Sequence, residues 1–169
     1  LHTMREKDTF FDVGSNSGIY SILSGKVLQS MTYCYEPSTE CFKRLTKNIE
    51  LNNLKDKVFP NKIAVGNKKE KRKFTKNLNC IGRFVSESDL NIDYEDVEVT
   101  TLNHEVYSHN TDSFFIKIDV EGFESEVFKG GKESFKNNNC IAVIVELCRN
   151  GKDFGYSEKD LFEEIKKCD

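Results

Sequence analysis

A glycine-containing loop after an apolar run is the first feature of this sequence that could do chemistry. Residues 10–18 read FFDVGSNSG, with Gly14, Asn16 and Gly18 at alternate positions. Glycine allows a positive φ and lets a ligand approach the backbone closely. Such a loop, when it follows a buried parallel strand and opens a helix, forms a nucleotide-sized cradle at the carboxyl end of that strand.

The spacing within the loop separates classes of nucleotide. A dinucleotide-binding loop reads G-x-G-x-x-G, with an acidic residue about 20 residues further on. Here the loop reads G-x-N-x-G from Gly14 to Gly18, without the late glycine. That spacing matches the looser G-x-G-x-G loop of S-adenosylmethionine (SAM) methyltransferases. Glu36 follows the next apolar run, and its two carboxylate oxygens can accept hydrogen bonds from both hydroxyls of a ribose.

Asp119 and Glu121 are the candidate groups for acid–base chemistry. They lie two residues apart at the end of an apolar run, FFIKIDV, at 114–120. Extended residues i and i+2 point to the same side, so we expect both carboxylates in one cleft, with Lys117 a step further inward. Glu146, after a later apolar run, is a third candidate. The alternative for these acids is a structural role, such as capping the helix that follows.

The remaining polar candidates have simpler interpretations. Carboxylates with a nearby asparagine can hold Mg²⁺, but nothing in the spacing of the acids demands a cation, so no metal site is predicted. His104 could act as a base because its unperturbed pKa lies near neutrality, although a loop histidine is the simpler interpretation. Tyr20 could contact the methionine end of SAM or pack beneath the sheet.

Strand-like and helix-like segments alternate along the chain, which indicates an α/β fold. Apolar runs predict strands at 10–13, 31–35, 58–65, 114–120 and 141–147, and helical patterns occur at 17–28, 38–52, from 124 and from 157. The polar section from 68 to 101 predicts antiparallel hairpins or an edge strand with a long loop, including short pieces at 83–86 and 97–101. This alternation implies right-handed crossovers and a parallel sheet covered on both faces, in one domain over residues 1–169.

Local signals refine three of these helices. Ser38 is predicted to cap the helix at 38–52, and Ser157 with Asp160 resembles a capping box at the start of the last helix. The pair Gly130-Gly131 predicts a break or bend in the helix that starts near residue 124.

Composition narrows the classes of partner that the protein could bind and the compartment in which it is expected. The net charge of −3 and a pI near 5.7 give no global attraction to nucleic acid or to an anionic membrane. The sequence contains no run of 18 apolar residues, the length needed to span a bilayer, and its first residues lack the apolar core of a leader. A cytoplasmic protein is therefore the default expectation. The six cysteines include no C-x-x-C pair and are expected to be free thiols rather than disulfide or zinc ligands.

A cluster of basic residues between 68 and 76 leaves two interpretations open. A solvated hairpin is the first, and a site for an anionic substrate is the second. The cluster comprises Lys68, Lys69, Lys71, Arg72, Lys73 and Lys76.

Several motifs, taken in order, resemble the FkbM family of SAM-dependent methyltransferases. The motifs are DVGSNSGIYS at 12–21, YEPS at 35–38, NIELNNL at 48–54, AVG at 64–66, KIDVEGFE at 117–124, VFKGG at 127–131 and IVE at 144–146. The resemblance runs from about residue 10 to residue 147, and KIDVEG is its most specific part. It implies a Rossmann-like class I methyltransferase sheet with helices on both faces, SAM as cofactor, and methyl transfer to a hydroxyl of a glycan or small metabolite.

The resemblance also implies roles for individual residues. Glu36 would hold the ribose, Asp119 would lie beside the cofactor as base or substrate anchor, and the adenine would lie near Ile63 and Ala64. The loop around the methionine end would be made by Asp12, Gly14, Ser15, Asn16 and Gly18.

Two departures from the family pattern stand out. Asn103 occupies a place where many members have an aspartate, so a carboxylate role there is absent. The expected sixth and seventh strands of the sheet have no sequence here, as in a truncated member or a fragment. Competing hypotheses are therefore a SAM-binding module without turnover, a methyltransferase acting on nitrogen or nucleic acid, and, less in keeping with the loop, an NAD-linked enzyme.

Overall fold

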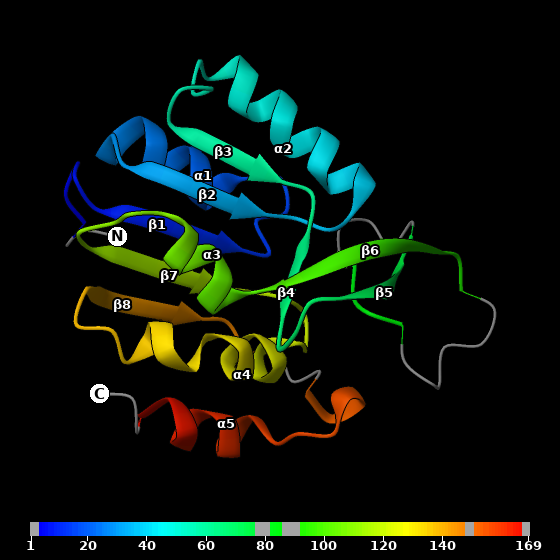
Figure 1. Cartoon of the computed structure of the whole chain (residues 1–169). Coiled ribbons are helices and arrows are strands. Elements are labelled where there is room, and N and C mark those ends of the chain that lie inside the picture. The colour runs from blue at the N-terminus through cyan, green and yellow to red at the C-terminus, as the bar shows by residue number, and fades with distance from the viewer. Residues whose placement is uncertain (1–3, 77–81, 86–91, 148–150, 167–169) are drawn as a thin grey trace.

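The computed structural model describes residues 4–76, 82–85, 92–147 and 151–166, and it is built around a parallel sheet (Figure 1). Five strands are ordered β3-β2-β1-β7-β8, and every neighbouring pair is parallel. Their bounds are β1 Thr9–Val13, β2 Met31–Tyr35, β3 Val58–Asn61, β7 Phe114–Ile118 and β8 Cys140–Val145. The predicted α/β class and parallel sheet are confirmed. The described residues contain no counterpart of the sixth and seventh strands.

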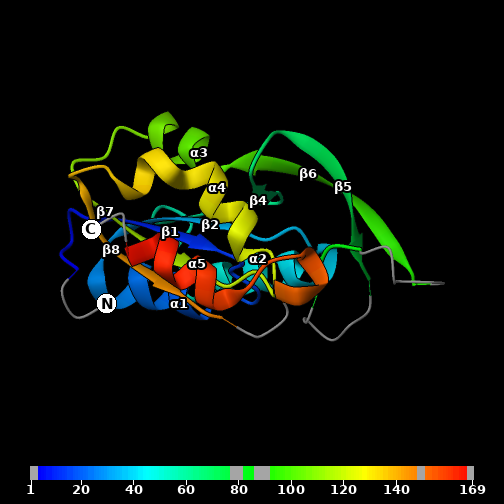
Figure 2. The same ribbon diagram turned by 90° about the horizontal axis from the view of Figure 1, so that it is seen from below.

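Helices lie on both sides of this sheet (Figure 2). One side carries α1 (Ile19–Leu23), its π-helical continuation η1 (Ser24–Leu28) and α2 (Thr39–Leu51); the other carries α3 (Leu102–Ser108) and α4 (Glu124–Phe135). The turn η2 (Gly151–Phe154) leads into α5 (Glu158–Ile165), which runs along the β8 edge. Within the described ranges, every helix is too short or too polar to cross a membrane.

The central strand β1 is buried on both faces, which explains its unbroken apolar character. Phe11 packs in the main core with residues of α3 and α4, whereas Phe10 packs on the opposite face with Phe115 of β7. Because side chains alternate along a strand, Asp12 points to the same face as Phe10. Asp12 lies opposite Lys117 in the register of β1 and β7, so this face brings two charged side chains together.

The helix predicted after Ser38 is confirmed together with its cap. The Ser38 hydroxyl accepts a hydrogen bond from the Cys41 backbone N–H at 3.4 Å, which satisfies one of the unpaired donors at the start of α2. Leu45 and Ile49 are buried against Val58 in a cluster beneath the helix. By contrast, Ser157 makes no side-chain cap at the start of α5, so the predicted capping box there is wrong.

The predicted strand at 58–65 is two strands in two different sheets. Val58–Asn61 pairs with β2, which ends at Tyr35 before the chain turns into α2. Beyond that point no neighbouring strand remains, and residues 64–66 instead form β4 in a second sheet. The sequence showed one continuous run because both pieces are buried or half-buried.

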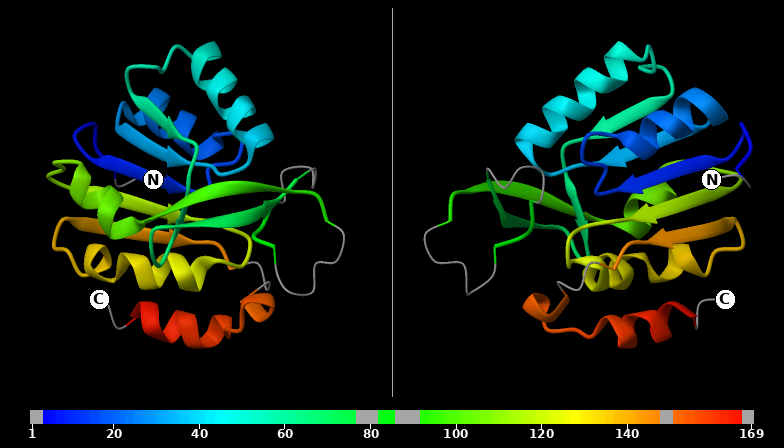
Figure 3. Two further views of the ribbon diagram at one scale, coloured as in Figure 1. Left: turned by 45° about the vertical axis from the view of Figure 1, so that its right-hand side comes forward. Right: turned by 180° about the vertical axis from the view of Figure 1, so that it is seen from behind.

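The second sheet forms an arm that projects past the carboxyl ends of the main strands (Figure 3). Its strands β4 (Ala64–Gly66), β5 (Glu70–Thr75) and β6 (Tyr94–Thr101) lie in the order β4-β6-β5, and β5 and β6 are antiparallel as predicted. Of the predicted piece at 83–86, Phe84 forms an antiparallel bridge with Phe74, and residue 86 lies outside the described ranges.

Acidic residues accompany the basic cluster of the arm. Lys68 and Arg72 both approach Glu70, at 3.3 and 3.6 Å, and Lys71 lies 3.0 Å from Glu98. These pairs favour the interpretation of a solvated hairpin. A further acid, Glu95 of β6, accepts a hydrogen bond from the Thr39 N–H at 2.9 Å and so anchors the arm to the start of α2.

Two further elements differ from the sequence expectations. The short helix α3 was not predicted, although Leu102 and Val106, four residues apart, bury one face of it and the Thr101 hydroxyl caps it. The predicted strand at 141–147 is β8 at 140–145, and it is only half-buried. Ile141 and Ile144 keep 45% and 40% of their surface exposed because β8 is the last strand in the order.

Gly130 and Gly131 do not break α4, which is continuous from Glu124 to Phe135. A Cβ at Gly130 would lie 2.0 Å from the carbonyl oxygen of Gly66 in β4, and one at Gly131 would lie 2.7 Å from Leu102 in α3. The two glycines therefore allow α4 to approach the arm and α3 closely.

Gly130→Ala should destabilise the fold by about 1–3 kcal/mol, because the added methyl group collides with backbone that cannot rotate away. At an exposed helix position the same change would stabilise the protein by up to about 1 kcal/mol, so the sign of the change in stability tells whether Gly130 is tightly packed. Urea unfolding measures the difference. Lys132→Ala, at an exposed position of the same helix, should change stability by less than about 0.5 kcal/mol. A Gly130→Ala protein as stable as the parent would contradict this packing.

Candidate functional site

A cavity opens at the carboxyl ends of β1 and β7, beneath the arm. The space inside it, counting the open mouth, is about 580 Å³. The polar side chains in its wall are those of Asn16, Glu36, Asp119 and Glu121. Phe74 and Phe84 of the arm, Pro37, Cys41 and Ala64 give the apolar part of the wall.

The glycine loop has the backbone shape that its sequence predicts. Gly14, Asn16 and Gly18 have φ values of 75°, 51° and 88°, all in the left-handed region. A Cβ at Gly14 would lie 1.8 Å from the Asp119 carbonyl oxygen, and one at Gly18 would lie 2.4 Å from Leu45. The loop can therefore take this shape only with glycine at the first and third places.

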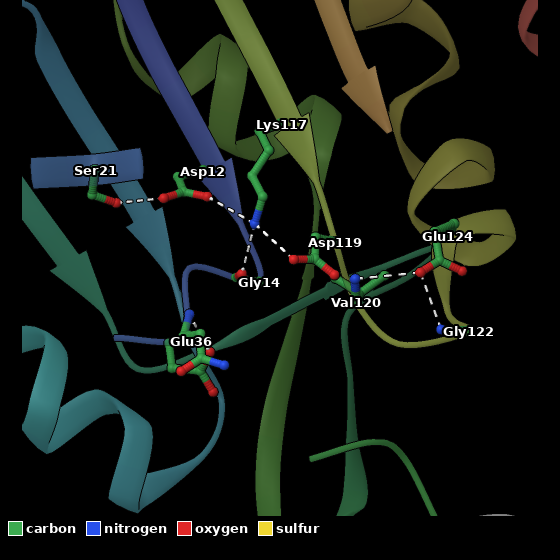
Figure 4. Close-up of polar contacts among 10 residues, drawn as sticks. Asp12, Gly14, Ser21, Glu36, Lys117, Asp119, Val120, Gly122 and Glu124 are labelled. Carbon is green, nitrogen blue, oxygen red and sulfur yellow. Dashed lines mark hydrogen bonds and ion pairs between the residues drawn. The ribbon is translucent and has the colours of Figure 1, made fainter. Parts of the chain in front are cut away.

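Lys117 joins the loop to the end of β7 (Figure 4). Its ammonium group donates to the Gly14 carbonyl oxygen and to Asp119 Oδ2, both at 3.1 Å, and lies 3.5 Å from Asp12 Oδ1. Asp12 Oδ2 accepts a hydrogen bond from the Ser21 hydroxyl at 2.6 Å. Burial raises the pKa of Asp12, and the attraction of Lys117 opposes that rise. Asp12 thus lies behind the loop, where it supports the cavity without lining it.

Glu36 stands at the end of β2, where the sequence predicts a ribose-binding acid. It is buried, and its two oxygens accept hydrogen bonds from the backbone N–H groups of Asn16 at 2.8 Å and Ser38 at 2.9 Å. Burial raises its pKa to about 7, and the two N–H donors limit that rise. The carboxyl group therefore titrates near neutral pH.

Asp119 and Glu121 both line the cavity, but not for the reason that their spacing suggested. The prediction assumed extended backbone, whereas β7 ends at Ile118 and the next residues turn. Glu121 has a φ of 52° and Gly122 a φ of 101°, so the chain reverses at this point. The turn, rather than strand alternation, brings the Glu121 side chain to the cavity beside Asp119.

Other predicted site residues lie outside the cavity wall. Glu146 is exposed beyond the end of β8, and Ile63 packs partly buried against the main core while its neighbour Ala64 lines the cavity. Ser15 and Gly18 are buried within the loop, and the Ser15 N–H donates to the Tyr35 carbonyl oxygen at 3.1 Å.

Two aromatic or imidazole candidates are also placed by the structure. His104 is exposed on α3, away from the cavity wall. The Tyr20 ring centre lies 5.3 Å from the Lys117 ammonium group, so Tyr20 covers that buried cation from the α1 side.

Apart from Ala64, the apolar wall of the cavity is not predicted by the sequence. Phe74 and Phe84 belong to a polar section with no legible pattern, and only the fold of the arm brings them to the cavity. Pro37 follows Glu36 directly and Cys41 lies in the first turn of the helix after it, so their place near Glu36 in the chain is the signal that the sequence offers.

The described part of the chain contains neither a candidate metal site nor a disulfide. No group of three or more His, Cys, Asp or Glu side chains there could hold a metal ion. Cys34, Cys41 and Cys140 carry thiols rather than disulfides. Cys80, Cys148 and Cys168 lie outside the described ranges.

Comparisons with known proteins identify methyltransferase relatives of this chain. Residues 12–169 match the model of the methyltransferase FkbM domain. The hexuronic acid methyltransferase AglP of Haloferax volcanii is 26% identical over 172 residues, which cover 99% of this chain and 69% of that protein.

Two solved structures show lower similarity. The N-terminal domain of human METTL16 in complex with SAH has a TM-score of 0.47 and 15% identity, covering 96% of this chain and 55% of that one. An RNA methyltransferase from Salinibacter ruber in complex with S-adenosyl-L-homocysteine has a TM-score of 0.42 and 12% identity, covering 80% of this chain and 60% of that one. The chain thus spans less than two thirds of each of these solved chains.

The raised pKa of Glu36 predicts a pH-dependent difference between the parent protein and Glu36→Gln. A carboxyl whose folded-state pKa is about 7 rather than its ordinary 4.5 stabilises the fold below pH 4.5, and this contribution is lost as pH rises through 7. The parent should therefore lose up to about 3 kcal/mol relative to the variant between pH 4.5 and pH 8. Urea unfolding of both proteins at several pH values measures this difference in stability. The titration of all other groups is common to the two proteins and cancels in the difference. Parallel curves for the two proteins would exclude a raised Glu36 pKa.

Proposed function

The chain belongs to the FkbM methyltransferase family, and from this premise we propose that it transfers the methyl group of SAM to a hydroxyl oxygen of a glycan or small metabolite. Residues 1–169 would act as one methyltransferase domain. The observation that carries the proposal is the cavity itself, which brings Glu36 and the acids Asp119 and Glu121 to either side of the glycine loop.

The residues of the cavity fit the cofactor of this family. Glu36 offers an ionisable carboxylate to the two ribose hydroxyls, since it can accept more hydrogen bonds than the two backbone N–H groups provide. Gly14 lies against the Asp119 carbonyl oxygen without space for a side chain, and the methionine end would lie in the cavity beside Asn16. Ala64 with Phe74 and Phe84 supplies apolar surface for the adenine.

Asp119 is the first candidate for the base. SAM supplies a methyl group already activated on a sulfonium, so the protein's tasks are to align the acceptor oxygen and to remove its proton. Asp119 Oδ2 is held by Lys117 at 3.1 Å, while the side chain keeps 27% of its surface exposed at the cavity. The acceptor hydroxyl would give its proton to Asp119 as the new C–O bond forms and the C–S bond breaks. Glu121 would anchor the acceptor from the neighbouring position.

The class of acceptor rests on the named relative and on charge. AglP is a hexuronic acid methyltransferase by name, which supports a glycan acceptor for this chain. The arm offers little to a nucleic acid, because Lys68, Lys71 and Arg72 are paired with acidic side chains. The thiols of Cys34, Cys41 and Cys140 suit a reducing compartment, in line with a cytoplasmic enzyme.

Cofactor binding should depend on pH through Glu36. Because the ribose hydroxyls donate hydrogen bonds, they favour the ionised carboxylate, whose population falls below pH 7. The dissociation constant of SAH should therefore fall as pH rises from 5.5 to 8, by up to about tenfold per pH unit on the acidic side. Glu36→Gln should weaken binding and abolish this dependence. Calorimetric titration at four pH values tests it, and a variant that follows the parent curve would remove Glu36 from the ribose site.

Methyl transfer itself is tested with methyl-labelled SAM and a panel of acceptors. The panel contains hexuronic acid glycosides, neutral glycosides, a primary amine and an RNA oligonucleotide. We expect label only in the hydroxyl acceptors and strongest in the hexuronides, with Asp119→Asn lowering turnover by about 10²–10⁴-fold. Lys132→Ala serves as the control for handling, since that residue is exposed far along α4.

The alternatives give different outcomes in the same assays. SAH binding without transfer to any acceptor would favour a SAM-binding module. Label in RNA, with RNA binding that weakens as salt rises, would favour a nucleic-acid methyltransferase. Failure to bind either SAM or SAH would exclude both the enzyme and the module.

A further inference from the structure

A buried acid outside the cavity holds the turn that presents Glu121. Glu124, the first residue of α4, is only 2% exposed. Its Oε1 accepts hydrogen bonds from the Val120 N–H at 3.3 Å and the Gly122 N–H at 3.0 Å (Figure 4). These two N–H groups flank Glu121 in the chain. One carboxylate oxygen of Glu124 therefore holds the turn around Glu121, although Glu124 itself does not line the cavity.

The turn needs such support because its conformation is unfavourable for Glu121. A non-glycine residue with φ near 52° lies in the left-handed region, which persists only where neighbouring contacts determine it. Gly122, at φ 101°, can adopt its conformation without a side-chain penalty. Glu124 supplies a side-chain constraint beside the backbone hydrogen bond from the Phe123 N–H to the Val120 carbonyl oxygen, since its bonds to both flanking N–H groups are lost if the turn relaxes.

The C-terminal segment holds Glu124 in turn. The Tyr156 hydroxyl donates a hydrogen bond to Glu124 Oε2 at 2.5 Å, so both oxygens of the carboxyl group are engaged. Tyr156 lies between η2 and α5 and packs against the main core. A line of contacts thus runs from the core through Tyr156 and Glu124 to the turn at the cavity.

We propose that Glu124 is a positioning residue that sets the place of the Glu121 carboxylate for methyl transfer, with Tyr156 orienting Glu124. The proposal rests on the proposed function for its consequence in catalysis, although its structural half stands without it. The reach of the side chain, rather than its charge, is the decisive property. Gln at 124 keeps both the length and an acceptor oxygen for the two N–H groups, whereas Asp keeps the charge but is one methylene shorter.

The structural half is tested by amide hydrogen exchange at Gly122. Glu124→Asp should speed exchange by about tenfold or more, because the hydrogen bond to the carboxylate is lost, and Glu124→Gln should leave it close to the parent. Glu126→Gln is the matched control, because Glu126 lies two residues further along α4 and pairs with Lys129 instead. Equal exchange in the parent and Glu124→Asp would overturn the proposal whether or not the protein is a methyltransferase.

The catalytic half is tested with methyl-labelled SAM and a hexuronide acceptor. Glu124→Asp should lower kcat by up to about 100-fold, because a small misplacement of the acceptor that Glu121 anchors can cost that much, while the SAH dissociation constant changes less than threefold. Glu124→Gln should restore most of the rate, and Tyr156→Phe should cause a smaller loss than Glu124→Asp.

The double variant separates positioning from general damage to the fold. If Glu124 acts through Glu121, then Glu124→Asp should cause no further loss of kcat in a Glu121→Gln background. Additive losses would overturn the proposal, and so would a Glu124→Gln enzyme as slow as Glu124→Asp. Absence of SAH binding in the parent protein would instead overturn the proposed function and leave the Gly122 exchange result to decide the role of Glu124 in the turn.

Discussion

The buried ammonium group of Lys117 is the contact on which the shape of the cavity depends. It lies between the ends of β1 and β7, within 3.5 Å of Asp12, Asp119 and the Gly14 carbonyl oxygen, and it is only 4% exposed. Leaving one partner of such a buried ion pair alone costs about 3–5 kcal/mol, so the three partners cannot easily separate. The loop conformation, the register of the two central strands and the position of Asp119 are therefore coupled through one side chain.

Much of the fold follows from local patterns in the sequence. The strand at 31–35 and the helix after Ser38 appear with the predicted bounds or nearly so, because an apolar run and a capping hydroxyl act over a few residues. Long-range pairing is less legible. Nothing in residues 58–65 marks where β2 stops offering a partner, and Gly130-Gly131 shows its role only when Gly66 and Leu102 are brought beside it.

The candidate site shows the same division between local and distant causes. The left-handed loop from Gly14 to Gly18 and the place of Glu36 could be predicted, because glycine spacing and a strand end determine them. Asp119 and Glu121 line one cavity as expected, yet through a turn with positive φ that the residue types alone do not reveal. Glu146 also follows the end of a strand, but it is exposed and does not line the cavity.

The two walls of the cavity are built on different sheets, and this has a consequence for how such a site can evolve. Glu36 and Asp119 stem from the main sheet, whereas Phe74 and Phe84 stem from the arm, which Glu95 ties to the start of α2. Phe74 and Phe84 belong to a small apolar cluster that also includes Phe123 at the start of α4, whereas Lys117 contacts Asp12, Gly14 and Asp119. A lineage can therefore reshape the apolar wall of the cavity by mutation of the arm while the glycine loop, Lys117 and Asp119 are inherited unchanged.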